Sequence, residues 1–294
     1  MTAKTAQLRS LINSGERFIA ADAVTVLMAR LAERTGFPAL YVGGHALGSF
    51  HYGIPDLGAL EPHEVIEQTG RIARSVSIPV VVDADELGGN VASIHRNIRD
   101  YESAGLSGIH MEDEHEPKHS SYQPALLTPE DMQGRIAAAV AAKTDPDFVI
   151  IARTNELIHR TSLYATRGSF GEGTIAAVIK RGQAYAEAGA DAYLPTGLEA
   201  DEVDEVARAV PIPLAAYSQL GDVKVILSTG WAVHNAVHVY EKWARVLLEA
   251  GTLPAEAHKS CDGFLSLLGQ EQYDEAIFQW ASRAGLPAVE MTEQ

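Results

Sequence analysis

Short runs of apolar residues alternate along the chain with stretches in which apolar residues recur at helical spacing. The run RFIAAD at 17–22 precedes AVTVLMARLAERTG, and IPVVVDAD at 78–85 precedes NVASIHRNIRDYESAG. A continuous apolar run is typical of a strand in a parallel sheet covered on both faces, and the helical spacing predicts the covering helices. The runs that predict strands lie at 17–22, 38–44, 78–85, 107–113, 147–154, 191–197, 212–218 and 223–230.

Eight strands, most of them followed by a helix, predict an α/β fold built as a single (β/α)8 barrel of the TIM type. Several predicted helices end in Gly just before the next strand, as in TGFPAL and AGADAY, which is the left-handed stop of such a turn. The alternative is an open doubly wound sheet, but GGHALG at 43–48 lacks the glycine spacing of its phosphate loop. No linker interrupts residues 1–250, which are therefore expected to form one catalytic domain.

Composition narrows the classes of partner. The chain has 294 residues, 46% of them hydrophobic, and a formal net charge of −16. A surface this acidic repels phosphate backbones, so no nucleic-acid partner is expected, and an anionic substrate would need a local cation. The single cysteine, Cys261, excludes an intramolecular disulfide and a zinc site with two thiolates. The sequence shows no signal peptide and no run of about 18 apolar residues, so a cytoplasmic protein without a membrane partner is expected.

Carboxylates crowd two neighbouring strand ends, where a barrel carries its chemistry. Strand alternation places Asp83 and Asp85 on one side with their Cα atoms ~6.6 Å apart, and Glu112 ends the next strand ~5 Å away. Three acids this close cannot all stay ionised without a cation, and oxygen ligands favour Mg²⁺, with Mn²⁺ as an alternative. The competing interpretation is that these acids cap helices or pair with arginine.

Arg153 stands at the following strand end and is the candidate for binding a substrate carboxylate with two parallel hydrogen bonds. The competing interpretation is a structural ion pair with one of the acids.

Five motifs in this order resemble the isocitrate lyase/phosphoenolpyruvate mutase superfamily over most of residues 8 to 250. They are YVGG, GIPDLG, DADELGGN, HMEDEHEPK and IIART, which resemble the family's Y-x-S-G, G-x-P-D-x-G, D-x-D-x-G-x-G-N, E-D-x-x-x-P-K and A-R-T/V patterns. The resemblance implies that Asp83, Asp85, Asp56 and Glu112 hold Mg²⁺. It implies further that Tyr41, Gly43, Gly44 and Arg153 hold the carboxylate and 2-oxygen of a 2-oxo or 2-hydroxy acid. It also implies a homotetramer, with residues 251–294 forming a helical extension that is swapped onto a neighbouring subunit.

The loop after the fourth strand departs from the lyase pattern. Lyase members carry a catalytic Cys there, whereas this chain reads Lys118, His119, Ser120, Ser121, Tyr122. The loop is closer to that of the phosphoenolpyruvate mutase and phosphonopyruvate hydrolase branch, with Ser120 and Ser121 expected to bind substrate. Lys118 and His119 are the expected catalytic groups, because the unperturbed pKa of a histidine lies near neutrality and a serine is too weak an acid. The alternatives are a proton from Tyr122, or an exposed loop histidine without a role.

Other positions differ from the family pattern around the expected metal. Four positions carry other residues than the family usually has: Gly43 stands for Ser, Asn155 for Asp, Thr196 for Glu or His, and Tyr217 for Asn. A substrate unlike isocitrate is therefore expected. The stretch HRTSLYATRGSFGEG at 159–173 is expected to form a lid, with Arg160 and Arg167 as spare cations for a second carboxylate. The pair His234 and His238 has the helical spacing of zinc ligands but lacks the Glu of H-E-x-x-H, and is interpreted as a helix face.

Three functions remain open from the sequence. The leading hypothesis is a Mg²⁺-dependent lyase that cleaves a C–C bond in a small 2-oxo or 2-hydroxy acid, by retro-aldol cleavage or decarboxylation, through a metal-stabilised enolate. The second is P–C chemistry, either mutase or phosphonopyruvate hydrolase. The third is a catalytically silent barrel that binds or assembles.

Overall fold

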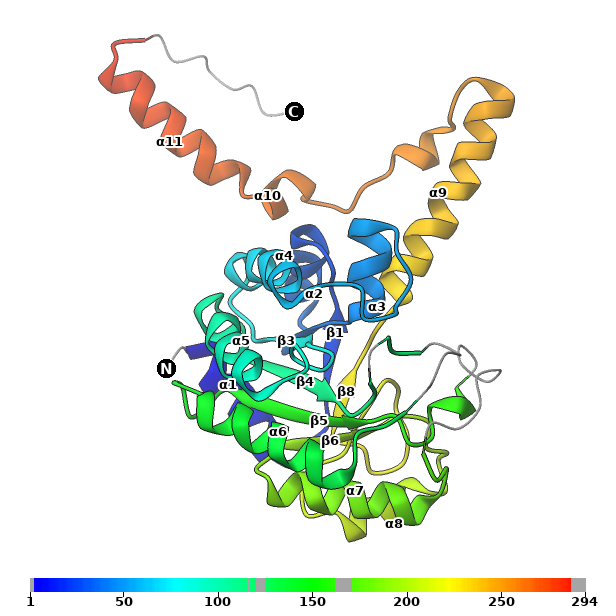
Figure 1. The fold of residues 1–294 in the computed structure, drawn as a ribbon. Helices are drawn as coiled ribbons and strands as arrows, with labels where there is room; N and C mark the ends of the chain where they lie inside the picture. The colour runs from blue at the N-terminus through cyan, green and yellow to red at the C-terminus, as the bar shows by residue number, and fades with distance from the viewer. Residues whose placement is uncertain (1–2, 116, 120–124, 162–170, 287–294) are drawn as a thin grey trace. The chain divides into compact units, whose positions relative to one another are not determined.

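The apolar runs form one sheet of eight parallel strands that curls into a barrel (Figure 1). The computed structural model describes residues 3–115, 117–119, 125–161 and 171–286. In hydrogen-bonding order the strands run β6-β5-β4-β3-β2-β1-β8-β7. They are β1 (Phe18–Asp22), β2 (Ala39–Val42), β3 (Val80–Asp83), β4 (Gly108–Glu112), β5 (Val149–Thr154), β6 (Ala192–Pro195), β7 (Ala215–Ala216) and β8 (Val225–Leu227).

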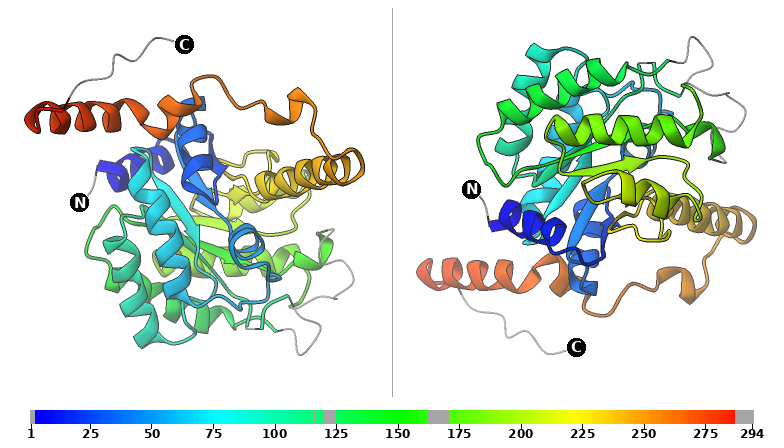
Figure 2. Two further views of the ribbon diagram at one scale, coloured as in Figure 1. Left: turned by 90° about the horizontal axis from the view of Figure 1, so that it is seen from above. Right: turned by 90° about the horizontal axis from the view of Figure 1, so that it is seen from below.

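Helices surround the strands on the outside, as expected for a (β/α)8 barrel (Figures 1 and 2). Most strands are followed by one, but β7 runs into β8 through a short loop without a helix. The helices of the barrel are α1 (Ala3–Asn13), α2 (Val26–Thr35), α3 (Gly44–Leu47), the π-helical η1 (Gly48–Tyr52), α4 (Pro62–Ser75), α5 (Val91–Ser103), α6 (Pro129–Ala142), the 3-10 helix η2 (Ile158–Arg160), α7 (Ile175–Glu187) and α8 (Val203–Ala209). Helix α9 (Trp231–Ala250) follows β8.

The core has an inner and an outer layer because successive residues of a strand face opposite sides. Along β5, Val149 and Ile151 belong to the inner layer, while Ile150 and Ala152 pack outward against the helices. Leu8 and Ile12 of α1 join the inner layer, so α1 closes the end of the barrel where the strands begin. The opposite end, where the strands finish, stays available for polar side chains.

The barrel closes weakly between β6 and β7. Strand β7 is two residues long, and its segment meets β6 through a single bridge between Tyr193 and Leu214. The Tyr193 amide donates to the Pro213 carbonyl at 2.9 Å. Beyond this bridge no further pairing holds β6 and β7 together in the described part of the chain.

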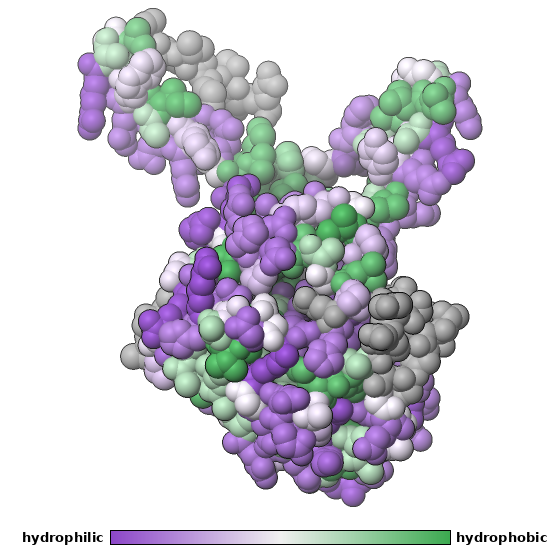
Figure 3. Space-filling view, viewed as in Figure 1, coloured by the Kyte–Doolittle hydropathy of each residue, from purple (hydrophilic) through white to green (hydrophobic). Residues whose placement is uncertain are grey.

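The chain divides into two compact units, residues 1–236 and 237–294. The second unit contains most of α9, the 3-10 helix η3 (Ala255–His258), α10 (Phe264–Leu268) and α11 (Gln270–Arg283). Large hydrophobic side chains are exposed on it, and part of them is visible in Figure 3: Tyr240, Leu248, Leu265, Tyr273, Ile277, Phe278 and Trp280. The boundary after residue 250 and the packing of this extension on a neighbour stay predictions. None of the described helices combines the length and apolar character needed to cross a membrane.

Candidate active site

Three neighbouring strands direct charged side chains into the open end of the barrel. Asp83 ends β3, Glu112 ends β4, and Arg153 is the penultimate residue of β5. Strand register places Glu112 beside Arg153, and the inward alternation of each strand turns both side chains toward the barrel axis. The expected convergence of Asp83, Glu112 and Arg153 is therefore seen in the structure.

Asp85 reaches the same place by a route that alternation alone does not describe. Strand β3 ends at Asp83, and Asp85 lies beyond it in a left-handed conformation with φ of 49°. The Asp85 amide donates to Asp83 Oδ1 at 3.2 Å, which fixes this turn. A turn, and not a continued strand, brings the two carboxylates together.

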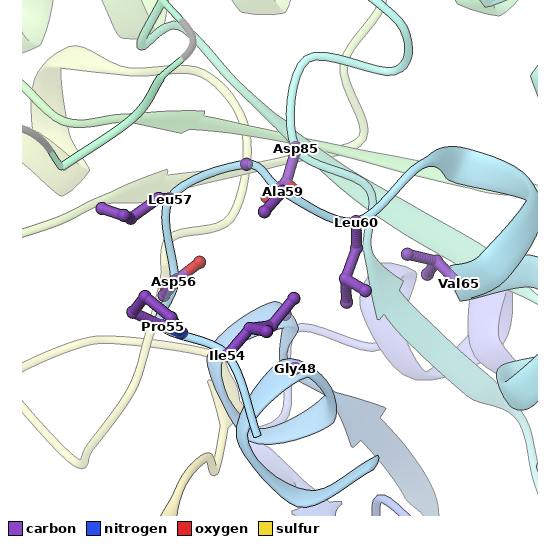
Figure 4. Close-up of a pocket in the computed structure, with 11 residues that line it drawn as sticks. Gly48, Ile54, Pro55, Asp56, Leu57, Ala59, Leu60, Val65 and Asp85 are labelled. Carbon is purple, nitrogen blue, oxygen red and sulfur yellow. The ribbon is translucent and has the colours of Figure 1, made fainter. Parts of the chain in front are cut away.

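Asp56 approaches from the loop between η1 and α4. This loop curls around a small hollow, in which the apolar side chains of Ile54 and Leu60 face each other, with Asp85 at the border (Figure 4). Packing of these apolar residues holds the loop over the barrel, so Asp56 faces the acids of β3 and β4.

The Lys118 ammonium lies between three of these carboxylates. Its Nζ atom is 3.0 Å from Asp56 Oδ1 and 3.3 Å from Glu112 Oε1, and it also contacts Asp85 Oδ1. Only 1% of the Lys118 side chain is exposed, so the whole cluster is withdrawn from water. Within the described ranges no group of three or more His, Cys, Asp or Glu side chains is arranged to hold a metal ion, and the Lys118 ammonium lies among the acids.

The charges in the cluster shift one another's pKa values. Burial raises the pKa of Asp85 well above its ordinary range, and repulsion from Asp83, Glu112 and Asp56 adds to it, while Lys118 opposes it. Burial also opposes ionisation of Glu112, yet Arg153 and Lys118 lower its pKa to about 2. For Asp83, burial is outweighed by His110, Lys118 and Arg153, which hold its pKa well below normal. Burial therefore leaves Asp85 with a raised pKa, whereas the nearby cations lower the pKa values of Asp83 and Glu112.

Arg153 is held in place from several sides. Its guanidinium lies 2.9 Å from Glu112 Oε2, its Nε donates to Asn155 Oδ1 at 2.9 Å, and it lies 5.8 Å from the centre of the Tyr217 ring. The competing interpretation of an ion pair with an acid is therefore realised through Glu112. A guanidinium carries five N–H donors, so this pair leaves donors for a substrate carboxylate.

Tyr41 and His110 form a buried pair, of which sequence analysis had named only Tyr41. The Tyr41 hydroxyl shares a hydrogen bond of 2.6 Å with His110 Nε2, which lies 3.4 Å from Asp83 Oδ1. Burial lowers the pKa of His110 to about 4, so this histidine is neutral at neutral pH. Sequence analysis missed His110, although GIHME shows the signal, because His110 and Glu112 are two residues apart and share the inner face.

Gly43 and Gly44 bring the backbone close to the acids. The Gly44 amide donates to Asp83 Oδ2 at 3.1 Å. A Cβ atom at Gly43 would lie 2.4 Å from Thr229 Oγ1, so only glycine fits there without a shift of Thr229. Their expected contact with a substrate stays a prediction.

His119 is buried, not exposed on a loop, and Glu114 is the partner that sequence analysis missed. His119 Nδ1 lies 2.7 Å from Glu114 Oε2, and its backbone amide donates to Glu114 Oε1. Asn155 Nδ2 links the two acids by donating to Glu114 at 2.8 Å and to Glu112 at 3.0 Å. His119 has φ of 57°, a conformation that is uncommon for a residue with a side chain. Ser120, Ser121 and Tyr122 lie outside the described residues.

A second buried polar network lies around Asp113, next to the ends of β4 and β5. Asp113 is fully buried and accepts from Thr154 Oγ1 at 2.6 Å, Tyr185 Oη at 2.7 Å and Arg181 at 3.1 Å. Arg181 also donates to Glu156 at 2.8 Å. This network joins β4, β5 and α7, and so fixes the strand ends that carry Glu112 and Arg153.

Arg160 is not the spare cation expected from the sequence. It donates to both carboxylate oxygens of Glu202, each at 2.9 Å. Arg167 and most of the stretch expected to form a lid lie outside the described residues.

The amino-acid sequence is similar to those of known proteins over most of its length. A family model of phosphoenolpyruvate phosphomutase matches residues 8–234. Phosphonopyruvate hydrolase of Variovorax sp. (strain Pal2) is 36% identical over 291 residues, which cover 92% of this chain and 96% of that protein. The chain belongs to the phosphoenolpyruvate mutase/isocitrate lyase superfamily.

Other members of this superfamily show the same relation. 2,3-Dimethylmalate lyase of Eubacterium barkeri is 33% identical over 215 residues, covering 72% of this chain and 69% of that protein. The crystal structure of phosphonopyruvate hydrolase in complex with oxalate and Mg²⁺ superposes with a TM-score of 0.78 at 32% identity, covering 93% of this chain and 98% of that one. The predicted family and barrel are confirmed, and homologues that are lyases confirm the predicted class of enzyme.

Proposed function

We propose that this protein is a Mg²⁺-dependent lyase that cleaves a C–C bond in a small 2-oxo or 2-hydroxy carboxylic acid. The observation that supports it is the buried cluster of Asp56, Asp85 and Glu112 around Lys118, with Arg153 beside it. Superfamily members cleave C–C bonds or P–C bonds, and the proteins similar to this chain include 2,3-dimethylmalate lyase and phosphonopyruvate hydrolase.

The donor set of this cluster fits a hard divalent cation. Asp56, Asp83, Asp85 and Glu112 present only oxygen atoms, and burial together with the neighbouring carboxylates raises the pKa of Asp85. These four residues would hold Mg²⁺, or Mn²⁺ in its place. When bound, the ion supplies Lewis-acid stabilisation of negative charge on the substrate oxygens.

Arg153 provides the positive charge that the chain itself offers to a substrate. In a 2-oxo acid, loss of a substituent from C3 leaves an enolate whose charge rests on the 2-oxygen. In a 2-hydroxy acid, the hydroxyl proton passes to a base, the C2–C3 electron pair moves to C3, and an acid delivers a proton there. In the first reaction negative charge develops on the C2 oxygen, and in the second the C2 oxygen carries it as an alkoxide before the C2–C3 bond breaks. The fixed N–H donors of Arg153 stabilise negative charge at this oxygen without reorganisation.

Lys118 and His119 are the proposed proton carriers. A divalent ion held by these acids would balance their charge in place of Lys118, whose amine would then be available to exchange a proton with the substrate. His119 Nε2 lies 3.7 Å from Asp56 Oδ2, and the ring is held on its other side by Glu114. Ser120 and Ser121 are proposed to bind the substrate, as the family loop suggests.

The test is release of a 2-oxo acid from a panel of malate-like and oxaloacetate-like acids, detected by reduction with NADH and lactate dehydrogenase. We expect release that requires Mg²⁺ or Mn²⁺, is abolished by EDTA and is lost in Asp85→Asn. The matched control is Asp201→Asn, at an exposed acid outside the site. Calorimetry should show Mg²⁺ binding that tightens with oxalate and disappears in Asp85→Asn. Failure of every acid in the panel with either metal ion would overturn the proposal.

A second candidate function is P–C chemistry of the mutase or hydrolase type. The observation that favours it is the 36% identity with phosphonopyruvate hydrolase over 92% of this chain. A ³¹P spectrum of phosphonopyruvate incubated with the protein and Mg²⁺ decides between the two candidates. Conversion to inorganic phosphate or to phosphoenolpyruvate would establish this activity, and an unchanged signal would exclude it.

We further propose a homotetramer in which the extension at 251–294 packs on a neighbouring subunit, in a cytoplasmic enzyme. The exposed hydrophobic side chains of α10 and α11 support this, because a face of that kind in water marks an interaction site.

A further inference from the structure

A hollow of about 180 Å³, partly open to solvent, lies at the ends of β6 and β7. Residues of both strands line it, among them Leu194, Thr196, Ala216 and Tyr217. None of the proposed metal ligands or proton carriers lines it.

The hollow arises from the weak closure of the barrel. Strands β6 and β7 meet only at the bridge between Tyr193 and Leu214, and no ladder joins them beyond it in the described part of the chain. Residues that follow these two strand ends line the hollow, which lies between them. A feature of the fold therefore creates space directly at the active end of the barrel.

The hollow adjoins the proposed site. Leu194 is the register neighbour of Arg153 across the β5–β6 ladder. The ring of Tyr217 lies 5.8 Å from the Arg153 guanidinium and 6.4 Å from the Tyr41 ring. A substrate with its carboxylate at Arg153 can therefore extend a substituent past Tyr217 into this space.

The lining is apolar and uncharged. Of its 14 described residues, nine are aliphatic or proline, one is glycine and four carry hydroxyl groups; none is charged. Arg160 directly precedes Thr161, one of the lining residues, but its guanidinium is bound to the Glu202 carboxylate. A carboxylate in this hollow would lose its hydration without gaining a charged partner among these residues, which is costly.

One polar atom of the lining has no partner. Thr196 is 5% exposed, and its Oγ1 makes no hydrogen bond to any described residue. A buried hydroxyl left without a partner is unfavourable, and a neutral hydrogen-bonding atom or a water molecule beside an apolar ligand would satisfy it.

We infer that the hollow between β6 and β7 binds an uncharged, mainly apolar substituent at C3 of the substrate. The inference rests on the proposed function and narrows its substrate class. It selects alkyl-substituted 2-hydroxy or 2-oxo acids over acids with a further carboxylate at that position. Thr196, Ala216 and Tyr217 are then residues that determine specificity.

Isocitrate and 3-isobutylmalate test this inference as a matched pair. Both are malates substituted at C3, by CH₂COO⁻ and by CH₂CH(CH₃)₂, and the two substituents have the same number of heavy atoms. We expect kcat/KM at least about 100-fold higher for 3-isobutylmalate, because only the charged group enters the hollow unpaired. Calorimetric titration of the pair into Mg²⁺-loaded protein measures the same preference even where neither acid is cleaved.

Two variants locate the preference in the hollow. Ala216→Leu fills part of the space and should lower kcat/KM for 3-isobutylmalate at least tenfold more than for unsubstituted malate. Thr196→Val removes the hydroxyl and should not lower kcat/KM for 3-isobutylmalate relative to kcat/KM for malate. The matched control, Ala141→Leu on the exposed face of α6, should leave the preference unchanged.

The outcomes separate this inference from the proposed function. Cleavage or binding of isocitrate as good as that of 3-isobutylmalate would overturn the inference while leaving a lyase intact. A preference that Ala216→Leu does not reduce would overturn it as well. Oxalate binding and a clear preference, without cleavage of any acid, would contradict the lyase and keep the assigned specificity.

Discussion

At the scale of single residues, the site depends on the balance between buried acids and a few cations. Asp85 has a pKa raised by burial and by its neighbouring carboxylates, whereas Arg153 and Lys118 hold the pKa of Glu112 at about 2. Arg153 forms an ion pair with Glu112, and in the proposed function it also presents hydrogen-bond donors to the substrate. The two tasks can be separated experimentally, because lysine keeps the charge and loses the fork of donors.

We predict that Arg153→Lys lowers kcat/KM for the cleaved acid by about 100- to 1000-fold, the loss typical of one preorganised donor at a developing oxyanion. The fold should survive, because the charge opposite Glu112 is kept. Steady-state kinetics and thermal unfolding of the same preparation check both statements. The matched control is Arg99→Lys on the exposed face of α5, which should leave kcat/KM unchanged. Unchanged kinetics in Arg153→Lys would show that Arg153 acts by charge alone.

At the scale of elements, helix α7 packs so closely on β6 that its glycine has no room for a side chain. A Cβ atom at Gly182 would lie 2.6 Å from the Tyr193 ring and 2.7 Å from Val210 Cγ2. Gly134 on α6 has nothing within 4 Å of its would-be Cβ atom. Because both glycines lie in helices, replacing either by alanine brings the same gain in helix propensity. The two positions differ only in the space available for a Cβ atom.

We predict that alanine at these two positions changes stability in opposite directions. Gly134→Ala should raise the free energy of unfolding by about 0.5 to 1 kcal/mol, because alanine has the higher helix propensity. Gly182→Ala should lower it by about 1 to 3 kcal/mol, because overpacking against Tyr193 outweighs the same gain. Urea unfolding of the two variants measures both signs. Stabilisation by Gly182→Ala would mean that α7 moves away from β6 without cost.

The Glu202 carboxylate, at the start of helix α8, is paired with Arg160 and with the Glu199 amide. Burial opposes its ionisation, but the Glu199 amide and Arg160, each at 2.9 Å, lower its pKa below the usual value of 4.5. A carboxylate with a lowered pKa stabilises the fold above its unfolded-state pKa, and the contribution is lost as the pH falls through the folded-state value.

We therefore predict that Glu202→Gln lowers the free energy of unfolding by about 0.5 kcal/mol at pH 7, a typical value for an accessible ion pair. The difference from the parent protein should be smaller at pH 3, because the contribution of Glu202 is lost as the pH falls through its lowered folded-state pKa. Urea unfolding at the two pH values checks this, with the exposed Glu16→Gln as control. An equal difference at both pH values would assign the effect to packing and not to charge.

At the scale of the whole molecule, the helices after residue 236 expose more hydrophobic surface than a separate subunit would keep in water. Ile277 and Trp280 of α11 are 57% and 63% exposed. Contiguous apolar surface of this kind is stabilised when a second chain covers it. This exposed surface is the observation that supports the proposed assembly.

We predict a solution mass about four times the 31.6 kDa of one chain by light scattering. Ile277→Glu should yield a smaller assembly, because it introduces a charge into the covered face. Gln279→Glu adds the same charge nearby on α11 and should keep the tetramer if only the apolar face is buried. A monomeric parent protein would contradict the proposed assembly.

The sequence by itself determined the strands, their inward faces and the charges at their ends. Apolar runs and period-two alternation are local properties, so they suffice to place Asp83, Glu112 and Arg153 at one end of a barrel. The same alternation in GIHME also contained His110, which was overlooked because a histidine inside a buried strand has no motif of its own.

Only the tertiary structure decided how residues far apart in sequence meet. The left-handed turn at Asp85, the ammonium of Lys118 among three acids and the contact of Glu114 with His119 depend on loop paths that no local periodicity encodes. The hollow between β6 and β7 depends on the point at which the barrel closes. Local pattern fixes which face of an element is buried, whereas closure of the sheet fixes which side chains share a site and how much space they leave.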